Sequence, residues 1–173
     1  MSTYPPIPAG RRLTASLLTA MLPNIIVKEL TTERASTTTV ALDPELQFQG
    51  EANARYLVEF NLIPAAVTAA GFKTQWSVPL GASGFKNVLG PASNASNTNA
   101  DQITMRAGVH IYNSDVAYAG VRNNNSTAFT VLEYSVITLG NAGTVGLSWA
   151  QNATSTTPTR LFVGSWMRVT RLS

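Results

Sequence analysis

The chain has 173 residues, a formal net charge of +3, only 12% charged residues and no cysteine. This length suits one domain with a short extension, and the lack of cysteine excludes disulfides and thiolate chemistry. The cations are scattered, with Arg11 and Arg12 as the only adjacent pair, so no basic stripe indicates a nucleic-acid interface. Charged side chains oppose self-association, and this chain has few of them. We therefore expect an oligomer or a component of a larger assembly.

Residues 1–12 form a proline-rich arm that contains Pro5, Pro6 and Pro8. Proline cannot donate a backbone hydrogen bond, so we expect the arm to be extended until it binds a partner. No stretch of the chain approaches the roughly 20 apolar residues that cross a bilayer. We therefore expect neither membrane insertion nor signal-directed export.

A short helix is predicted at residues 15–22, because Thr14 is a suitable N-cap and Pro23 ends the segment. Leu13 and Leu18 have the spacing of a hydrophobic staple. A helix of about two turns is unstable alone in water, so its apolar face must be buried. Either it packs on this chain's own body, or arm and helix together insert as an anchor into a neighbouring subunit or another protein. The predicted anchoring residues are Arg11, Arg12, Leu13, Leu17, Leu18, Met21 and Leu22.

From residue 24 onwards the apolar pattern has the period of two that is typical of β-strands. The segment 54–62 alternates most regularly and is predicted to be a central strand with Tyr56 and Phe60 facing the core. Asp43-Pro44 is predicted to be a turn, and residues 81–100 are predicted to form the longest loop. The expected strands are 25–30, 36–42, 46–48, 54–62, 72–79, 103–112, 116–121, 127–139, 146–151 and 161–169.

Two of these segments carry further expectations about burial. Residues 127–139 are apolar on both faces, so we expect burial on both, either between two sheets or between a sheet and a neighbouring subunit. The last two strands, which contain Trp149 and Trp166, are predicted to form a hairpin that closes the sheet, since a tryptophan can anchor its inner face.

The strands follow one another at intervals of roughly 8–12 residues, typical of an antiparallel β-sandwich, and no helix is predicted between them. A jelly roll is favoured because it limits open sheet edges. We therefore predict an all-β protein. Residues 1–23 form the arm and anchoring helix, and residues 24–173 form an antiparallel β-sandwich with jelly-roll topology.

The sequence contains no recognisable catalytic or metal-binding motif. His110, the only histidine, is predicted to be an ordinary strand residue, and zinc would need mostly carboxylate ligands. Candidates for a carboxylate pair in glycoside hydrolysis are Glu59, Glu133, Asp101 and Asp115. Glu59 and Glu133 interrupt apolar strands and are expected to pair with an arginine instead: Arg55, Arg106 or Arg168. We therefore expect that the protein is not an enzyme and binds neither a metal nor a cofactor. A hydrolase is kept as a third hypothesis.

Asparagine-rich loops at 93–99, 113–115 and 123–126 support a second hypothesis, a receptor- or carbohydrate-binding module. Their amides would supply polar contacts, and a tyrosine or tryptophan would supply a stacking platform. Turns also require asparagine and glycine, and we favour this interpretation of the same residues. The candidate receptor contacts are Tyr112, Tyr118 and Asn124.

Several segments resemble a known group of proteins. Residues 8–23, PAGRRLTASLLTAMLP, resemble the amino end of small structural proteins encoded by tailed phages of actinobacteria. Residues 145–152, VGLSWAQN, and 163–169, VGSWMRV, are similar to the carboxyl end of the same group. The segments 36–48 and 56–59 are similar to their first core strands. The pair Arg11-Arg12 and the loop 81–100 depart from the group's pattern.

The resemblance implies a virion protein with a jelly-roll body, often trimeric and attached to the particle through its amino end. We therefore expect a non-enzymatic trimer on the virion surface, assembled in the host cytoplasm. Its expected partners are its own copies and capsid or tail proteins, as a head decoration or a tail appendage. A host-surface glycan is the expected ligand in the alternative, a receptor-binding module.

Overall fold

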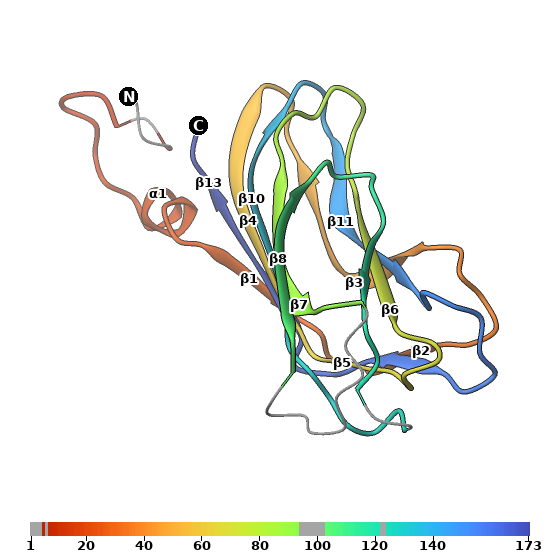
Figure 1. The fold of residues 1–173 in the computed structure, drawn as a ribbon. Coiled ribbons are helices and arrows are strands. Elements are labelled where there is room, and N and C mark those ends of the chain that lie inside the picture. Colours follow the sequence, from red (N-terminus) through yellow and green to blue (C-terminus); the bar gives the residue numbers. More distant parts are fainter. Residues whose placement is uncertain (1–4, 6, 94–102, 122–123) are drawn as a thin grey trace.

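In the computed structural model, residues 5, 7–93, 103–121 and 124–173 are described, and they fold into two facing antiparallel sheets, a third small sheet and one short helix (Figure 1). The elements are α1 (Ala15–Ala20), β1 (Asn24–Val27), β2 (Thr32–Arg34), β3 (Ala41–Gly50), β4 (Ala54–Leu62), β5 (Pro64–Ala65), β6 (Phe72–Ser77), β7 (Lys86–Pro91), β8 (Met105–His110), β9 (Val116–Tyr118), β10 (Val131–Leu139), β11 (Gly143–Ala150), β12 (Thr159–Leu161) and β13 (Trp166–Arg171).

The two main sheets have the strand order of a jelly roll. The six-stranded sheet runs β1-β13-β4-β10-β7-β8, and the four-stranded sheet runs β3-β11-β6-β9. The strand pairs are nested along the chain: β3 pairs with β11, β4 with β10, β6 with β9 and β7 with β8. Such nested pairs arise when one long antiparallel hairpin folds across two sheets, which is the jelly-roll topology. It confirms the predicted all-β antiparallel sandwich.

Strand β4 lies in the middle of the six-stranded sheet, between β13 and β10, as its alternation predicts. Its side chains Tyr56, Val58, Phe60 and Leu62 are buried. Phe60 meets Trp76 of the facing sheet edge-on, with ring centroids 4.9 Å apart. The inner face of β4 therefore joins the two sheets through aromatic packing.

The turn predicted at Asp43-Pro44 is wrong, because β3 continues through both residues. The pairing of β3 with β11 shifts register there, which makes a bulge. The Asp43 carboxylate accepts hydrogen bonds from the backbone N–H groups of Glu45 and Leu46 at 3.1 and 3.2 Å. It thus satisfies donors that the bulge removes from the ladder. The strand predicted to start at residue 36 begins only at Ala41.

The loop predicted at residues 81–100 contains a strand, β7, which pairs with both β8 and β10. Gly90 and Pro91 suggested a loop, but Gly90 lies beneath the ring of Tyr118, where a Cβ atom would be only 2.7 Å from ring carbons. Glycine is therefore needed here for close packing within a strand. Residues 94–99, the polar part of the predicted loop, lie outside the described residues.

The last two predicted strands exist as β11 and β13, but they do not form the expected hairpin. Strand β11 lies between β3 and β6, whereas β13 lies between β1 and β4 in the opposite sheet. The connection crosses from one sheet to the other and includes β12, which pairs with β2 and β5. Trp149 is fully buried and Trp166 half-buried. The final strand closes the core through Met167 and Val169.

Candidate functional site

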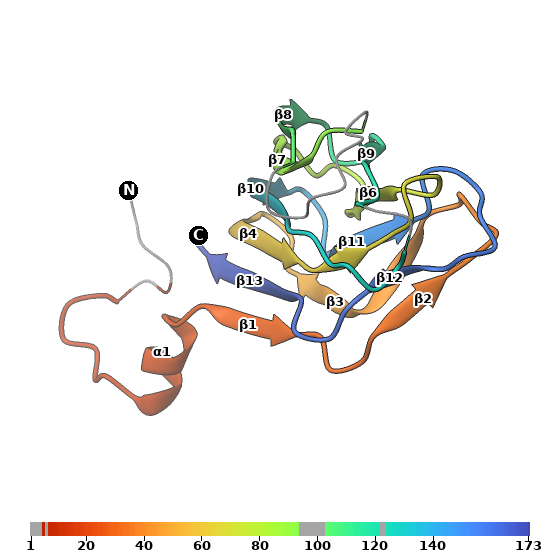
Figure 2. The same cartoon turned by 60° about the horizontal axis from the view of Figure 1, so that its bottom comes forward.

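Helix α1 stands at the edge of the body (Figure 2). Most of its apolar residues are exposed. The Thr14 hydroxyl caps it by accepting a hydrogen bond from the Leu17 N–H at 3.3 Å, and the helix ends at Ala20 rather than at residue 22. Leu17 is 7% exposed and is the helix's buried residue. The other predicted anchoring leucines and methionine are 49 to 68% exposed: Leu13, Leu18, Met21 and Leu22. Arg11 and Arg12 are also exposed.

The exposed apolar surface of the helix continues onto the edge of the six-stranded sheet. Ile25 and Val27 of β1, and Leu30 beyond it, are exposed as well. A hollow of about 410 Å³ between helix and body is lined by Leu22 and Phe48, so the helix is not packed tightly against the sheets. We call these residues the leader surface: Leu13, Leu18, Met21, Leu22, Ile25, Val27 and Leu30. Among the described residues, the chain's own body covers Leu17 but not the leader surface.

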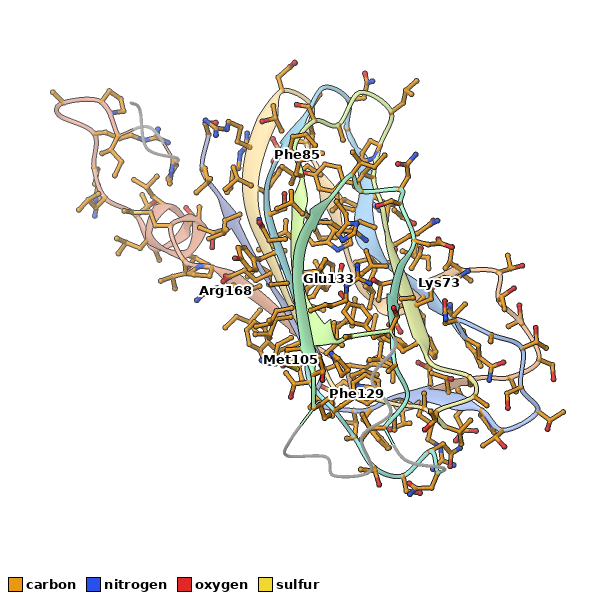
Figure 3. All side chains as sticks on the ribbon, in the orientation of Figure 1. Lys73, Phe85, Met105, Phe129, Glu133 and Arg168 are labelled. Carbon is orange, nitrogen blue, oxygen red and sulfur yellow. The ribbon has the colours of Figure 1, made fainter. Side chains whose placement is uncertain are left out.

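A second apolar surface covers the outer face of the six-stranded sheet, where β10, β7 and β8 lie side by side (Figure 3). The strand register places Tyr134 beside Asn87 and Asn87 beside Val109, so the three share that face. Seven apolar residues are 38 to 62% exposed there and form what we call the outer-sheet patch: Phe85, Leu89, Met105, Val109, Ile111, Tyr134 and Val136. The expectation that β10 is buried on both faces is thus met within the chain only on the inner face.

Strands β7 and β8 turn their charged residues inward, the reverse of an ordinary sandwich strand. Lys86 is fully buried, and Arg106 and His110 are half-buried. The Arg106 guanidinium donates to the Ala117 carbonyl at 2.8 Å and to His110 Nε2 at 3.4 Å. Burial, together with the positive charges of Arg106 and Lys86, lowers the pKa of His110, which leaves the ring neutral and able to accept that bond. The outward face of β8 therefore has the composition of a core face.

The inward charges meet in a polar cluster between the two sheets. The buried carboxylate of Glu133 accepts hydrogen bonds from the Thr74 hydroxyl, from Trp76 Nε1 at 2.6 Å and from the Tyr118 hydroxyl at 2.7 Å. Lys86 Nζ lies 3.7 Å from this carboxylate, and burial lowers the pKa of Lys86. The partner of Glu133 is thus Lys86 and not the predicted arginine. Because the whole cluster is enclosed in the core, it has a structural role.

The acidic residues do not form a catalytic pair in the described part of the chain. Glu59 lies on the outer face of the sheet, where it pairs with Arg168 as predicted, whereas Glu133 points into the sandwich. Asp115 is exposed in the β8–β9 connection, where it pairs with Lys73, and Asp101 lies outside the described residues. Within the described ranges, no three His, Cys, Asp or Glu side chains are grouped to hold a metal ion.

The three predicted receptor contacts lie in different settings. Tyr112 and Tyr118 are 5% and 0% exposed, so neither ring offers a face to a ligand in solvent. Asn124 is exposed, but its Oδ1 accepts hydrogen bonds from the backbone N–H groups of Ser126 and Thr127 at 3.0 and 2.8 Å. This geometry is that of an asparagine closing a turn.

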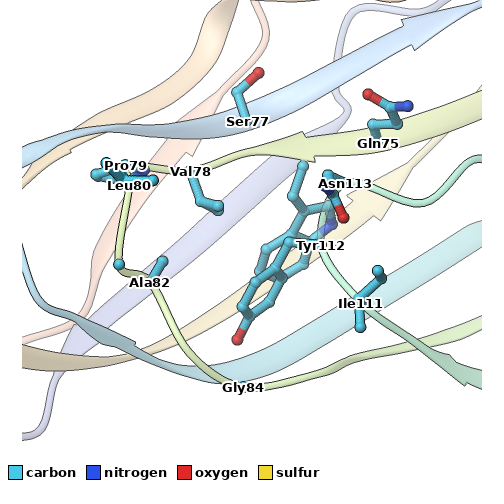
Figure 4. A pocket seen from close by; sticks show the side chains of 12 residues that line it. Gln75, Ser77, Val78, Pro79, Leu80, Ala82, Gly84, Ile111, Tyr112 and Asn113 are labelled. Atoms are coloured by element: carbon cyan, nitrogen blue, oxygen red, sulfur yellow. The ribbon is translucent and has the colours of Figure 1, made fainter.

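A hollow of about 540 Å³ lies at the end of β6, between the 78–84 segment and residues 111–113 (Figure 4). Tyr112 lines it and stacks on Trp76, with ring centroids 5.6 Å apart. Leu80 at the rim is 88% exposed. The polar side chains of Gln75, Ser77 and Asn113 also line the hollow. The volume falls in the range of small-ligand sites.

Sequence reasoning named only the helix part of the leader surface, and it missed the outer-sheet patch and the exposed residues Ile25, Val27 and Leu30. The available signal was apolar residues at 105, 109 and 111 alternating with Arg106 and His110. Alternation alone does not say which face is inside, so the charged face of β8 could not be assigned to the interior.

A comparison with known protein families found no family model that matches the chain, and no curated protein matches it. Among the described residues, no helix is both long and apolar enough to span a membrane.

Proposed function

We propose that this chain is a non-enzymatic structural protein of a phage particle. It forms a homotrimer displayed on the particle surface, as a head decoration or as a tail appendage. Residues 1–23 attach the jelly-roll body to a capsid or tail protein. The resemblance of the two ends of the chain to structural proteins of actinobacterial phages supports the virion assignment.

The observation that carries this proposal is the exposed leader surface. A helix of six residues is not stable alone in water, and α1 buries only Leu17 against the described part of the chain. Its remaining leucine and methionine side chains therefore need a partner that covers them. An amphipathic helix that docks in an apolar groove is a recurring mode of attachment between proteins.

The test compares binding of purified chains to phage particles assembled without this protein, measured by sedimentation. The full chain is expected to bind, and Leu18→Asp is expected to lose binding, because it places a charge on the docking face. Ser16→Asp is the matched control, since Ser16 is exposed on the same helix and its new charge suits a helix N-terminus. A chain lacking residues 1–23 should keep the folded body and fail to bind. Normal recruitment of that shortened chain would refute the anchor.

The hollow of Figure 4 favours a receptor- or carbohydrate-binding module as the second candidate function. It places the amide side chains of Gln75 and Asn113, groups that suit sugar hydroxyls, beside the exposed apolar side chain of Leu80. In a glycan array, Asn113→Ala should abolish binding, whereas Asn124→Ala, in a turn away from the hollow, should not. An array with no binding by the full chain would leave only the structural function.

A further inference from the structure

We propose that the outer-sheet patch is the surface through which copies of this chain contact one another, each copy burying its patch against the patches of its neighbours. The inference deepens the proposed function, because it locates the contact within the proposed trimer. Its partner is a second copy of this chain.

The reversed alternation of β7 and β8 is the first reason. Lys86 and Arg106 are turned into the sandwich, while Val109 and Ile111 face outward. Burying a charge is unfavourable unless it is paired and hydrogen-bonded. A strand that places its cations inside and its branched apolar residues outside is stable in an assembly where the outer face is also removed from water.

The charge pattern around the patch suits self-association. Among the described residues, the patch itself contains no charged side chain, and on the same face it is bordered by the ion pair of Glu59 with Arg168. The register Tyr134–Glu59–Arg168 places this pair directly beside the patch. A border that carries one anion next to one cation offers each neighbouring copy a charge opposite to one of its own. Interfaces with an apolar, charge-depleted core and a polar rim have this composition.

The size of the patch fits the core of an interface. An aromatic side chain has roughly 150 to 250 Å² of surface, so Phe85 and Tyr134, 61% and 48% exposed, together offer about 200 Å². The five aliphatic residues of the patch are 38 to 62% exposed and raise the exposed apolar area to roughly 450 Å². A standard interface buries about 800 Å² per partner, including its polar rim. The patch therefore supplies the apolar half of such a surface.

The oligomeric state of the full chain tests the proposal, measured by native mass spectrometry and by light scattering after gel filtration. The wild type is expected to be a trimer. Val109→Lys, on strand β8 of the patch, should raise the dissociation constant at least tenfold and release monomers with an unchanged circular dichroism spectrum. Val163→Lys is the matched control, because Val163 is also about half exposed but lies in the β12–β13 connection. Equal assembly of Val109→Lys and wild type would overturn the inference.

Cross-linking provides a second measurement that does not depend on weakening the contact. The chain has no cysteine, so each introduced thiol is unique. Under mild oxidation, Val109→Cys should form disulfide-linked dimers, because equivalent patches meet, and Val163→Cys should not. Cross-linking at Val163 with none at Val109 would place the contact elsewhere and overturn the inference.

The two proposals can fail separately. If removal of residues 1–23 alone turns the trimer into a monomer, the leader surface joins the copies and the patch inference is wrong, while the particle anchor is unaffected. If the chain assembles through Val109 but particles do not bind it, the patch inference holds and the proposed function is wrong.

Discussion

Replacing Glu133 by glutamine should destabilise the protein more than removing its partner Lys86. Glu133 has three neutral hydrogen-bond donors besides the lysine: Thr74, Trp76 and Tyr118. Lys86 Nζ, in contrast, has no hydrogen-bond partner among the described residues, and the carboxylate 3.7 Å away is its nearby opposite charge. Protein hydrogen bonds therefore stabilise the Glu133 carboxylate but not the Lys86 ammonium group.

The magnitude follows from the protonation of the lysine. In Glu133→Gln, buried Lys86 can avoid an uncompensated charge by losing its proton, which from the ordinary pKa of 10.5 costs about 5 kcal/mol at pH 7. The folded variant then binds one proton fewer than the unfolded chain, so its stability rises with pH by about 1.4 kcal/mol per unit. The loss relative to wild type should shrink to roughly 2 kcal/mol at pH 9.

Removing the lysine has a different signature. Lys86→Met leaves Glu133 with its three donors, and we expect a loss of about 1–3 kcal/mol without that rise from pH 7 to 9. The double variant removes both charges and should be at least as stable as Glu133→Gln, because a buried ion pair can be replaced by neutral groups at little net cost.

The assay is urea unfolding followed by tryptophan fluorescence at pH 7, 8 and 9, at one fixed protein concentration because the proposed self-association would also stabilise the fold. Glu133→Gln should gain stability with each pH unit relative to wild type. The reasoning is refuted if Lys86→Met is the more damaging change, or if the effect of Glu133→Gln is the same at pH 7 and pH 9.

Three further predictions concern other parts of the fold. Burial alone would raise the pKa of Asp43, but hydrogen bonds, above all from Trp149 Nε1 at 3.0 Å, hold it below its ordinary value of 3.8. The stability it contributes is present above pH 3.8 and is lost as pH falls through the lower folded pKa, so Asp43→Asn should flatten the acid limb of a stability-versus-pH curve. Thr14→Ala should weaken particle binding about fivefold through a loss of about 1 kcal/mol of helix stability, with the melting temperature of the body unchanged. Gly120→Ala should lower the free energy of unfolding by roughly 3 kcal/mol or more, because its Cβ would lie 2.1 Å from the Val67 carbonyl oxygen. The measurement is the melting temperature, which should fall strongly.

Strand existence and fold class could be predicted because the period of two is a local property of the sequence. Segment 54–62 shows this best: its alternation indicated both a strand and its buried face, and β4 confirms both. The jelly roll followed from strand number and spacing together with the resemblance. Boundaries were less predictable, because local turn chemistry at Asp43-Pro44 is overridden by hydrogen bonds within the bulge.

Features that depend on distant residues could not be predicted. Gly90 suggests a loop unless Tyr118 is known to lie above it. The terminal strands looked like a hairpin, since nothing local shows that their connection crosses between sheets. The partner of Glu133 was expected to be an arginine on a neighbouring strand, and Lys86 becomes a candidate only once β7 is recognised as a strand beside β10.

The two apolar surfaces differ in what binding requires, and this difference sets the order of assembly. The outer-sheet patch lies on paired strands that are rigid before contact, whereas α1 must gain stability from its partner. If the two proposals hold, copies associate first, and each proposed trimer then presents three anchors at once. Linked anchors raise overall affinity by roughly 10² to 10⁴ without any new contact. Val109→Lys should thus reduce particle binding by about 100-fold although its leader surface is intact, and Val163→Lys should not. Equal particle binding by these two variants would refute this coupling of self-association to attachment.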